Sequence, residues 1–424
     1  MLLEMNKTKA KRMVEIASTF VLQKTHKNNW AGEDDITYAS AAWMNSIDPK
    51  YATSGRFQKF IEIIDHNYST GRKTAKMCRI LPFTYEIVEE ARNLPRGYFV
   101  DNKDKETMMK DYGSHYSAAV LRKDILDVLD HAINKPQCYK LSADDALYLD
   151  LMKLWIDKDG TLFSHYRQAG ERKTYYTPSL QQASKKLRDF LLENTGYCDV
   201  DAKSSFNYDF SMLLAKYGWD ELSFDEYFTL ETYFGRNSRK FVMTKGITKQ
   251  EHLAMMFGSV EAKEKINKLE HLSTVFPLHH LMFASVEAKA KINEDDVLLD
   301  GARQKINKNF GATKFDEIRA ALEKFTLLLA YKPENQNLQG WEIPFIWSYK
   351  DYGRCLARIL NRIETKKMEV YSKQLDLMGY KTIQFCYDGL ILDKELTKED
   401  LEEVNDWFMD NEWESPLEVK KVWK

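Results

Sequence analysis

Cysteine and long hydrophobic runs are both scarce in this sequence. Its five cysteines are an odd number and none of them forms a CxxC pair, which argues against a disulfide framework and against a structural zinc site. No apolar run approaches the roughly 18 residues of a membrane span, and the initial MLLEMNKTKAKRM lacks the apolar stretch of a signal peptide. We therefore expect a globular protein of a reducing compartment, the cytoplasm, without a membrane partner.

An excess of charge of either sign is also absent. The 62 basic and 64 acidic side chains give a formal net charge of −2, so a surface that binds nucleic acid must come from local clustering of Lys and Arg. Of the 424 residues, 44% are hydrophobic and 13% aromatic. A chain of this length and composition can bury a substantial core with two or three lobes around it.

The spacing of apolar residues predicts that residues 1–160 are mostly helical. Apolar side chains recur every three to four positions in 11–24, in 57–67 and in 118–132, which is the period of an amphipathic helix. No catalytic motif is found in this region.

The remainder of the chain combines helices with short strands. Residues 221–375 are expected to be mostly helical, and a long helix over 354–378 is expected to stop at Gly379. Two β-prone segments lie on either side of this region: GYCDVDA, which leads into a helix, and a hairpin with strands at 382–385 and 390–392. An amphipathic helix over residues 398–410 is expected to follow the hairpin.

Two aspartates stand at the ends of these strands. Asp201 lies at the end of the GYCDVDA strand, and Asp388 lies in the tight turn of the hairpin. Joining a nucleoside triphosphate to a 3′ hydroxyl calls for two Mg²⁺ ions about 4 Å apart, and Mg²⁺ takes few protein oxygens besides waters and substrate phosphates. Both aspartates are therefore candidate metal ligands. Taken singly, each is also explained as a local hydrogen-bonding residue.

A basic helix is expected between the two aspartates, over residues 245–257. Lys245, Lys249 and Phe257 fall on one face of this helix. Such a face can bind triphosphate oxygens through the two lysines, donate a proton to the departing pyrophosphate from Lys249 and stack a base or ribose on Phe257. The alternative is an ordinary basic helix surface that faces solvent.

In their order along the chain these three segments resemble the motifs of the palm-and-fingers polymerases. This family includes the single-subunit RNA polymerases of T-odd phages and mitochondria and the bacterial repair-type DNA polymerases. The segment from Asp201 to Ser211 resembles the first palm motif, Lys245 to Gly258 the fingers motif, and Tyr387-Asp388-Gly389 the second palm motif. The resemblance implies an α+β, right-hand polymerase fold with a small antiparallel palm sheet, helical fingers and a mostly helical N-terminal region.

The resemblance also implies how the chain is divided. Residues 1–160 would form a helical, thumb-like N-terminal region, and 161–220 would form the first part of the palm with the first metal aspartate. Residues 221–350 would form the fingers. Residues 351–424 would complete the palm with the second metal aspartate and a C-terminal helix.

Individual side chains acquire roles from the same resemblance. Asp201, Asp388 and the backbone carbonyl of Ala202 would hold two Mg²⁺ ions, and Lys249 would act as the acid. The residues that would bind the nucleotide are Lys245, Lys249, Phe257, Gly258 and Ala202. The residues that would contact template and primer are Arg172, Arg358, Asn361, Glu364 and Tyr387. For Arg358, Asn361 and Glu364, packing within the palm is an equal alternative.

Several positions depart from the family pattern. Tyr387 replaces a His, Lys245 replaces an Arg, and Phe257 replaces the Tyr that RNA polymerases of the family use to choose ribonucleotides. DNA polymerases of the family accept Phe at the last position, but they usually carry a Glu five residues after the first Asp, where this chain has Phe206. The choice between ribose and deoxyribose therefore cannot be predicted from these residues.

The chain is too short to hold the large N-terminal promoter-binding region of the phage enzymes. In this respect it resembles the larger subunit of the heterodimeric middle-gene RNA polymerases of Enquatrovirus-type bacteriophages. That resemblance implies a DNA template, nucleoside triphosphates, an RNA product and a smaller second subunit as partners. It also implies recruitment by a phage single-stranded-DNA-binding protein and a location in the host-cell cytoplasm.

Three hypotheses about function follow from the sequence. The leading one is DNA-directed RNA synthesis by the catalytic subunit of an RNA polymerase. The second is a compact family A-like DNA polymerase or primase with the same fold. The third is a helical nucleic-acid-binding or scaffold subunit without catalytic activity.

Overall fold

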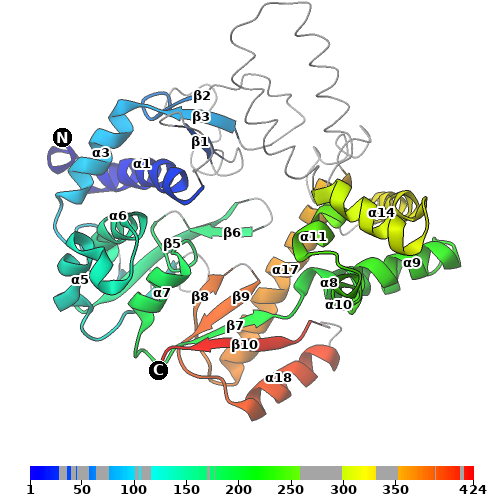
Figure 1. Cartoon of the computed structure of the whole chain (residues 1–424). Helices are drawn as coiled ribbons and strands as arrows, with labels where there is room; N and C mark the ends of the chain where they lie inside the picture. The colour runs from blue at the N-terminus through cyan, green and yellow to red at the C-terminus, as the bar shows by residue number, and fades with distance from the viewer. Residues whose placement is uncertain are drawn as a thin grey trace, which may run out of the picture.

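The computed structural model arranges helices and strands in three groups, each around its own cluster of buried hydrophobic residues. The described residues are 1–27, 36–39, 44, 57–63, 76–100, 105–106, 116–169, 172–175, 177–257, 298–330, 352–386, 388–410 and 415–424. Figure 1 shows the N-terminal elements on the left, a four-stranded sheet at the lower centre and a group of helices on the right. Among these residues, no helix is long and apolar enough to cross a membrane.

The N-terminal group combines helices with two small antiparallel sheets, whose strand orders are β1-β3-β2 and β4-β5-β6. Helices α1, α3 and α6 pack against one another over a shared core. The elements of this group are η1 (Leu2–Glu4), α1 (Lys7–Lys27), β1 (Ile36–Ala39), β2 (Ile61–Ile63), β3 (Lys76–Ile80), α3 (Pro82–Arg92), β4 (Tyr116–Val120), α5 (Ile125–Asn134), η2 (Pro136–Tyr139), α6 (Ala143–Met152), η3 (Lys153–Trp155), β5 (Thr161–Ala169), β6 (Arg172–Tyr175) and α7 (Lys185–Leu192).

The predicted helices of this region are confirmed for α1, wrong for the described part of 57–67 and confirmed only in the second half of 118–132. Within 57–67, residues Ile61–Ile63 form β2, in which Ile61 pairs with Ile80 of β3. The segment 118–132 divides into the end of β4 and the start of α5. In both segments, pairing with a strand distant in the sequence outweighs the local three-to-four spacing of apolar residues. A prediction from neighbouring residues cannot detect this pairing, because the partner strand lies outside the window that it considers.

The second group is an antiparallel sheet with the strand order β10-β7-β9-β8. Its elements are β7 (Cys198–Ala202), β8 (Thr382–Cys386), β9 (Gly389–Leu392), α18 (Lys398–Asp410) and β10 (Leu417–Val422). The strand predicted in GYCDVDA, the hairpin and the helix α18 are confirmed, whereas β10 is an addition to the prediction. Side chains of α17 and α18 cover the sheet. Between these two helices the rings of Tyr371 and Phe408 stack, with their centroids 3.6 Å apart.

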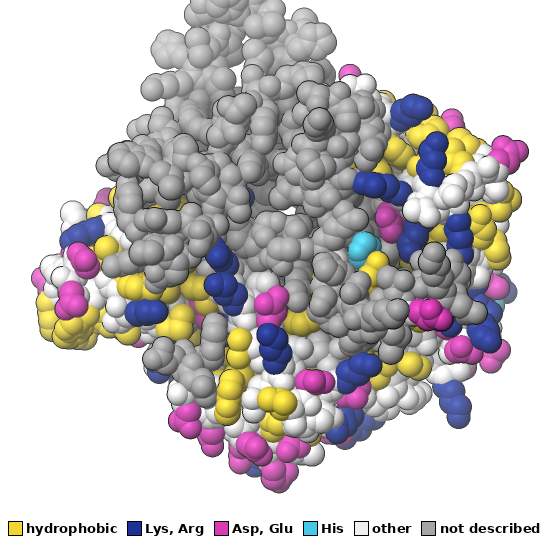
Figure 2. Space-filling model, turned by 180° about the vertical axis from the view of Figure 1, so that it is seen from behind, with side chains coloured by type: hydrophobic (Ala, Val, Ile, Leu, Met, Phe, Trp, Pro, Cys, Tyr) yellow, Lys and Arg dark blue, Asp and Glu magenta, His cyan; other side chains and the backbone are white. Residues whose placement is uncertain are grey.

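The third group is helical, as predicted for the described part of 221–375. Its elements are α8 (Ser205–Tyr217), α9 (Phe224–Phe234), α10 (Ser238–Thr244), α11 (Lys249–Phe257), a helix over 298–310, α14 (Lys314–Ala330) and α17 (Tyr352–Leu377). At its centre Phe210 of α8 contacts Phe234 and Phe325, with ring centroids 5.7 and 5.3 Å apart. Figure 2 shows basic and acidic side chains interspersed over the described part of one face, in keeping with the small net charge.

A buried ion pair joins α8 to α17 behind the four-stranded sheet. The ammonium of Lys367 donates to both carboxylate oxygens of Asp209, at 2.7 and 2.9 Å, and to the hydroxyl of Ser205 at 2.7 Å. Lys367 is 0% and Asp209 is 3% exposed. Burial raises the pKa of Asp209, and the charge of Lys367 opposes that rise. Because α8 follows β7 and α17 precedes β8, this contact ties together the two parts of the chain that carry Asp201 and Asp388.

We predict that Lys367→Met destabilises the protein by about 3–5 kcal/mol, because it leaves the carboxylate of Asp209 buried without its counter-charge. Urea unfolding measures the loss. The exposed Lys373 lies on the same helix, so Lys373→Met is the matched control and should stay within roughly 0.5 kcal/mol of the wild type.

The double variant Lys367→Met/Asp209→Leu separates the ion pair from simple packing. Replacing both charges by apolar side chains of similar volume is commonly neutral, so most of the lost stability should return. A double variant as unstable as the sum of the two single variants would contradict the prediction.

Candidate active site

The structure places Asp201 and Asp388 side by side, although 187 positions separate them in the sequence. Asp201 lies on β7 directly opposite Gly389, the first residue of β9. The backbone N–H of Ala202 donates to the carbonyl oxygen of Asp388 at 2.8 Å. Strands β7 and β9 are neighbours in the sheet (Figure 1), so the two aspartates lie at the same end of these adjacent strands.

Close approach of the two strands explains the glycine that follows Asp388. A β-carbon built on Gly389 would lie 2.5 Å from the carbonyl oxygen of Val200 and 3.3 Å from Oδ1 of Asp201. Contacts of that length with backbone atoms cannot be accommodated without moving a strand. The Asp-Gly order at the hairpin therefore brings the second carboxylate as near to β7 as the backbone permits.

The carboxylate of Asp201 is largely removed from solvent. Its side chain is 25% exposed, and burial, followed by the charge of Asp388, raises the pKa of Asp201 to about 6. Burial also raises the pKa of Asp199, two residues earlier on the strand, and the charge of Asp388 adds to that rise. The negative charge gathered around the partly buried Asp201 makes this a place where a cation is favoured.

Lys420 of β10 supplies one positive charge to this place. Its ammonium lies 3.4 Å from Oδ2 of Asp201 and also contacts Glu418, which pairs with Asp201 across the two strands. Lys420 opposes the rise in the pKa of Asp201. No local signal in the sequence points to Lys420, because only the pairing of β10 with β7 brings it to the site.

The two carboxylates suit Mg²⁺ better than a metal ion that takes all of its ligands from the protein. Within the described part of the chain, no cluster of three or more His, Cys, Asp or Glu is placed to hold a metal ion. Mg²⁺ keeps several waters and uses one or two carboxylates together with substrate phosphates. Asp201 and Asp388 can hold such ions, and the predicted part of the Ala202 carbonyl in binding them remains a prediction.

The single basic helix predicted over 245–257 is wrong. Helix α10 ends at Thr244 with Lys245 as its C-cap, and Gly246 has a φ of 78°, in the left-handed region. Lys249 begins a separate helix, α11. The N–H groups of Gly246 and Ile247 donate to the carbonyls of Met243 and Val242 at 3.0 and 3.2 Å, which is the pairing that closes a helix end at a glycine.

A capping box then starts the new helix. The N–H of Thr248 donates to the carboxylate of Glu251 at 2.7 Å, and the N–H of Glu251 donates to the Thr248 hydroxyl at 3.2 Å. The sequence contained both signals, since a glycine commonly ends a helix and Thr-x-x-Glu commonly begins one. The regular spacing of the lysines concealed them.

Lys245 and Lys249 consequently occupy different settings. The ammonium of Lys245 lies over the rings of Phe241 and Phe310, at 5.9 and 5.7 Å. Lys249 is exposed in the first turn of α11, where the helix dipole disfavours a cation and favours an anion. Lys249 is therefore the better placed of the two to meet a phosphate.

Helix α11 is held rigidly against the helical group. His252 is 3% exposed, its Nε2 lies 2.7 Å from the carbonyl oxygen of Tyr233, and its ring stacks on Phe234. Burial lowers the pKa of His252. The guanidinium of Arg319 donates to the carbonyl of Met255 at 2.7 Å.

At the end of α11 the fingers motif meets the first palm motif. The ring of Phe257 contacts that of Phe206 edge to face, with centroids 5.4 Å apart at 77°. Phe206 stands five residues after Asp201. The two positions at which this chain departs from the family pattern for sugar choice are thus in contact with each other.

The other predicted site residues are only partly described. Gly258 and Tyr387 lie outside the described residues, as does the side chain of Arg172, whose backbone begins β6. Arg358 and Asn361 are half-buried on α17, whereas Glu364 is only 2% exposed. The protein itself covers Glu364, which favours the packing alternative for that residue.

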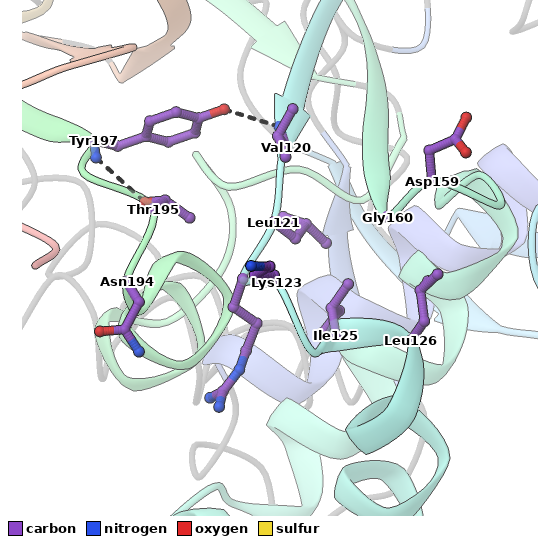
Figure 3. Close-up of a pocket in the computed structure, with 11 residues that line it drawn as sticks. Val120, Leu121, Lys123, Ile125, Leu126, Asp159, Gly160, Asn194, Thr195 and Tyr197 are labelled. Carbon is purple, nitrogen blue, oxygen red and sulfur yellow. Dashed lines mark hydrogen bonds between the residues drawn. The ribbon is translucent and has the colours of Figure 1, made fainter.

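A separate pocket lies at the opposite end of β7 from Asp201. Its volume is about 300 Å³, and its walls come from β4, the start of α5, the turn at Gly160 and the loop over 194–197. Figure 3 shows the Tyr197 hydroxyl accepting a hydrogen bond from the N–H of Val120, at 3.0 Å. This pocket lies where the N-terminal group meets the loop that leads into β7. It shares no residue with the carboxylate site.

Comparisons with known proteins give no family for this chain and one distant similarity to a solved structure. No protein-family model matches the chain, and no curated protein matches it. Among solved structures, the chain is similar to the POL domain of Pol1 from M. smegmatis in complex with DNA primer-template and dNTP, with a TM-score of 0.34 and 11% sequence identity over 98% of this chain. The chain spans 66% of the length of that protein. Similarity at this level does not establish a shared fold.

We predict that Asp201→Asn gains stability relative to the wild type as the pH rises in the presence of a chelator. The pKa of Asp201 is raised from 3.8 to about 6 in the folded protein, so the wild type is most stable below the lower value and loses stability as the pH rises through the higher one. The relative gain should reach roughly 1–3 kcal/mol at neutral pH. Urea unfolding at acidic and neutral pH measures it.

Saturating MgCl₂ in place of the chelator is the control for this prediction. A bound cation relieves the repulsion between Asp201 and Asp388 in the wild type, whereas Asp201→Asn lacks one of these two ligands. The difference in the free energy of unfolding between the two proteins should therefore become smaller. A difference between the two proteins that does not change with pH would contradict the prediction.

We predict that Gly389→Ala lowers any activity of the carboxylate site by roughly 100-fold, because a strand shift on the order of 1 Å misplaces Asp388. Cys386→Ala, in the paired position on β8, adds no atom toward β7 and serves as the control. Activity retained by Gly389→Ala would show that the spacing of β7 and β9 is unimportant.

Proposed function

We propose that this protein is a template-directed nucleotidyl transferase, and that it synthesises RNA on a DNA template. The observation that carries the proposal is the convergence of Asp201 and Asp388 on adjacent strands, with the pKa of Asp201 raised by burial and by its neighbour. The four-stranded sheet would be the palm of a right-hand polymerase, and the helices from α9 to α14 would be its fingers.

In this proposal Asp201 and Asp388 hold two Mg²⁺ ions. Bound there, the ions would supply the charge neutralisation that the attacking 3′ hydroxyl and the departing pyrophosphate require. The carboxylates position the reacting groups at this end of the two strands, and Lys420 balances part of their charge before substrate arrives. Substrate phosphates would complete the coordination, in agreement with a site of only two protein carboxylates.

Helix α11 would bind the incoming nucleotide. Eight residues separate Lys249 from Phe257, which corresponds to about 12 Å along the helix axis. That length suits a nucleoside triphosphate with its phosphates toward Lys249 and its sugar or base against Phe257. Lys249 would donate a proton to the leaving pyrophosphate, while Lys245 reaches a phosphate only by leaving Phe241 and Phe310, at a cost of roughly 0.5–1 kcal/mol.

The contact between Phe206 and Phe257 bears on the alternative of DNA synthesis. Neither ring offers a hydrogen bond to a 2′ hydroxyl, and neither position carries the carboxylate that would exclude one. A compact DNA polymerase or primase is therefore the second candidate.

We further propose that the chain works with a smaller second subunit and a phage single-stranded-DNA-binding protein, as in the heterodimeric middle-gene RNA polymerases that it resembles. Co-purification from the producing cell, followed by identification of the bound proteins, tests this assembly. A monomer active at a promoter would remove the case for a second subunit.

Extension of a labelled primer on a DNA template, with ribonucleotides or deoxyribonucleotides, tests the central proposal. Asp201→Asn and Asp388→Asn should each lower the rate by roughly 1000-fold or more, since each removes a ligand from the charge-neutralising site, and should leave template binding intact. Asp393→Asn, just beyond the far end of β9, is the matched control, because its carboxylate accepts from the N–H of Lys381 at the end of the strand away from Asp388.

The outcomes separate the hypotheses. Exclusive use of deoxyribonucleotides would sink the proposal of RNA synthesis and favour the second candidate. Unchanged rates in both aspartate variants would remove the metal site and favour a subunit without catalytic activity.

A further inference from the structure

Aromatic side chains cluster on the surface of the helical group, where the chain passes from α8 to α9. Trp219, Phe224 and Phe228 are 62%, 70% and 45% exposed. The rings of Phe224 and Phe228 are 4.4 Å apart, and Tyr227 contacts both Trp219, at 5.1 Å, and Phe228, at 5.6 Å. We call these four residues the aromatic patch. Single exposed hydrophobic residues are ordinary, but a contiguous cluster of large rings marks an interaction surface.

The aromatic patch stands on a rigid support. The opposite side of α9 places Leu230, Tyr233 and Phe234 in the hydrophobic core. Ion pairing of Glu226 with Lys324 at 2.6 Å fastens the helix to α14. A surface held in this way loses little conformational freedom when it binds a partner.

The surroundings of the aromatic patch are acidic. Residues 218–234 contain five acidic residues (220, 221, 225, 226 and 231) and no Lys, Arg or His, whereas the whole chain has 62 basic and 64 acidic residues. Asp220, Glu221 and Asp225 are exposed. Helix α14 adds two lysines to this segment: Lys324 pairs with Glu226, and Lys314 donates to the hydroxyl of Thr229. Against the five carboxylates, the balance of charge near the rings is therefore acidic.

This charge decides which kind of partner fits. Aromatic platforms for single-stranded nucleic acid lie in basic grooves, and here the phosphates would meet carboxylates. A second copy of the chain would bring two identical acidic surfaces face to face in a symmetric contact. Both occupants are disfavoured by like charge.

We propose that the aromatic patch is the docking site for a protein partner, through a segment that presents apolar side chains flanked by Lys or Arg. The apolar side chains would pack on Phe224, Phe228 and Trp219, and the basic ones would meet Asp220 and Asp225 at the rim. Figure 1 places α9 at the periphery, away from the four-stranded sheet. A partner docked there leaves the carboxylate site accessible, and the inference does not depend on the chemistry proposed for that site.

Selection from a library of random short peptides, with the full chain as target, tests the proposal. Enriched peptides should combine apolar residues with Lys or Arg. Their affinity, measured by fluorescence anisotropy, should fall at least roughly tenfold for Phe224→Ser/Phe228→Ser. Leu377→Ser, at an 82% exposed position on α17, is the matched control and should bind as the wild type does.

Charge reversal by Asp220→Lys/Asp225→Lys keeps the test valid should the Ser variant fold poorly. The basic peptides should bind this variant at least roughly tenfold more weakly. Peptides without basic residues, or affinities that neither double variant changes, would overturn the proposal.

Two further results would overturn the proposal by identifying a different occupant. One is binding of a labelled oligo-dT that is lost in the Ser variant, which would assign the aromatic patch to nucleic acid. The other is self-association of the wild type in sedimentation that the Ser variant abolishes, which would assign it to a second copy of the chain.

Discussion

An ammonium group buried in the protein interior, that of Lys367, holds together the helices that follow β7 and precede β8. Its partner, the carboxylate of Asp209, is equally buried, and each group alone would be costly to remove from water. The pair therefore permits one relative placement of α8 and α17 and penalises others. Since β7 and the β8–β9 hairpin are continuous with these helices, the positions of Asp201 and Asp388 depend on this contact.

Where β7 and β9 carry Asp201 and Asp388, the fold brings like charges together instead of opposite ones. Asp201 and Asp388 are brought together with incomplete compensation: burial first, and then the charge of Asp388, raise the pKa of Asp201, and the single charge of Lys420 opposes that rise. A fold that holds two carboxylates in this way gives up stability at neutral pH. Such an arrangement is expected where a cation and a polyanionic substrate complete the site.

The sequence predicted those elements whose signals are local. The apolar periodicity of α1, α17 and α18 and the turn residues of the hairpin lie within windows of a few residues, and the structure confirms all of these elements. Strand β2 was mistaken for a helix because its partner β3 lies outside such a window. The single helix predicted over 245–257 is wrong for a different reason: Gly246 ends one helix and Thr248 caps the next, so the regular spacing of the lysines continues across a break in the backbone.

By itself, the sequence determined which residue types stand at strand ends, which segments form helices and in what order the three motifs follow one another. Only the tertiary structure decided that Asp201 and Asp388 lie at the same end of adjacent strands, that Lys420 joins them and that Phe206 meets Phe257. The physical reason is that burial and charge–charge repulsion depend on distances between residues far apart in the chain. Those distances are set by strand pairing and by buried contacts such as the one between Lys367 and Asp209. Local propensity does not predict these contacts, because it depends only on neighbouring residues.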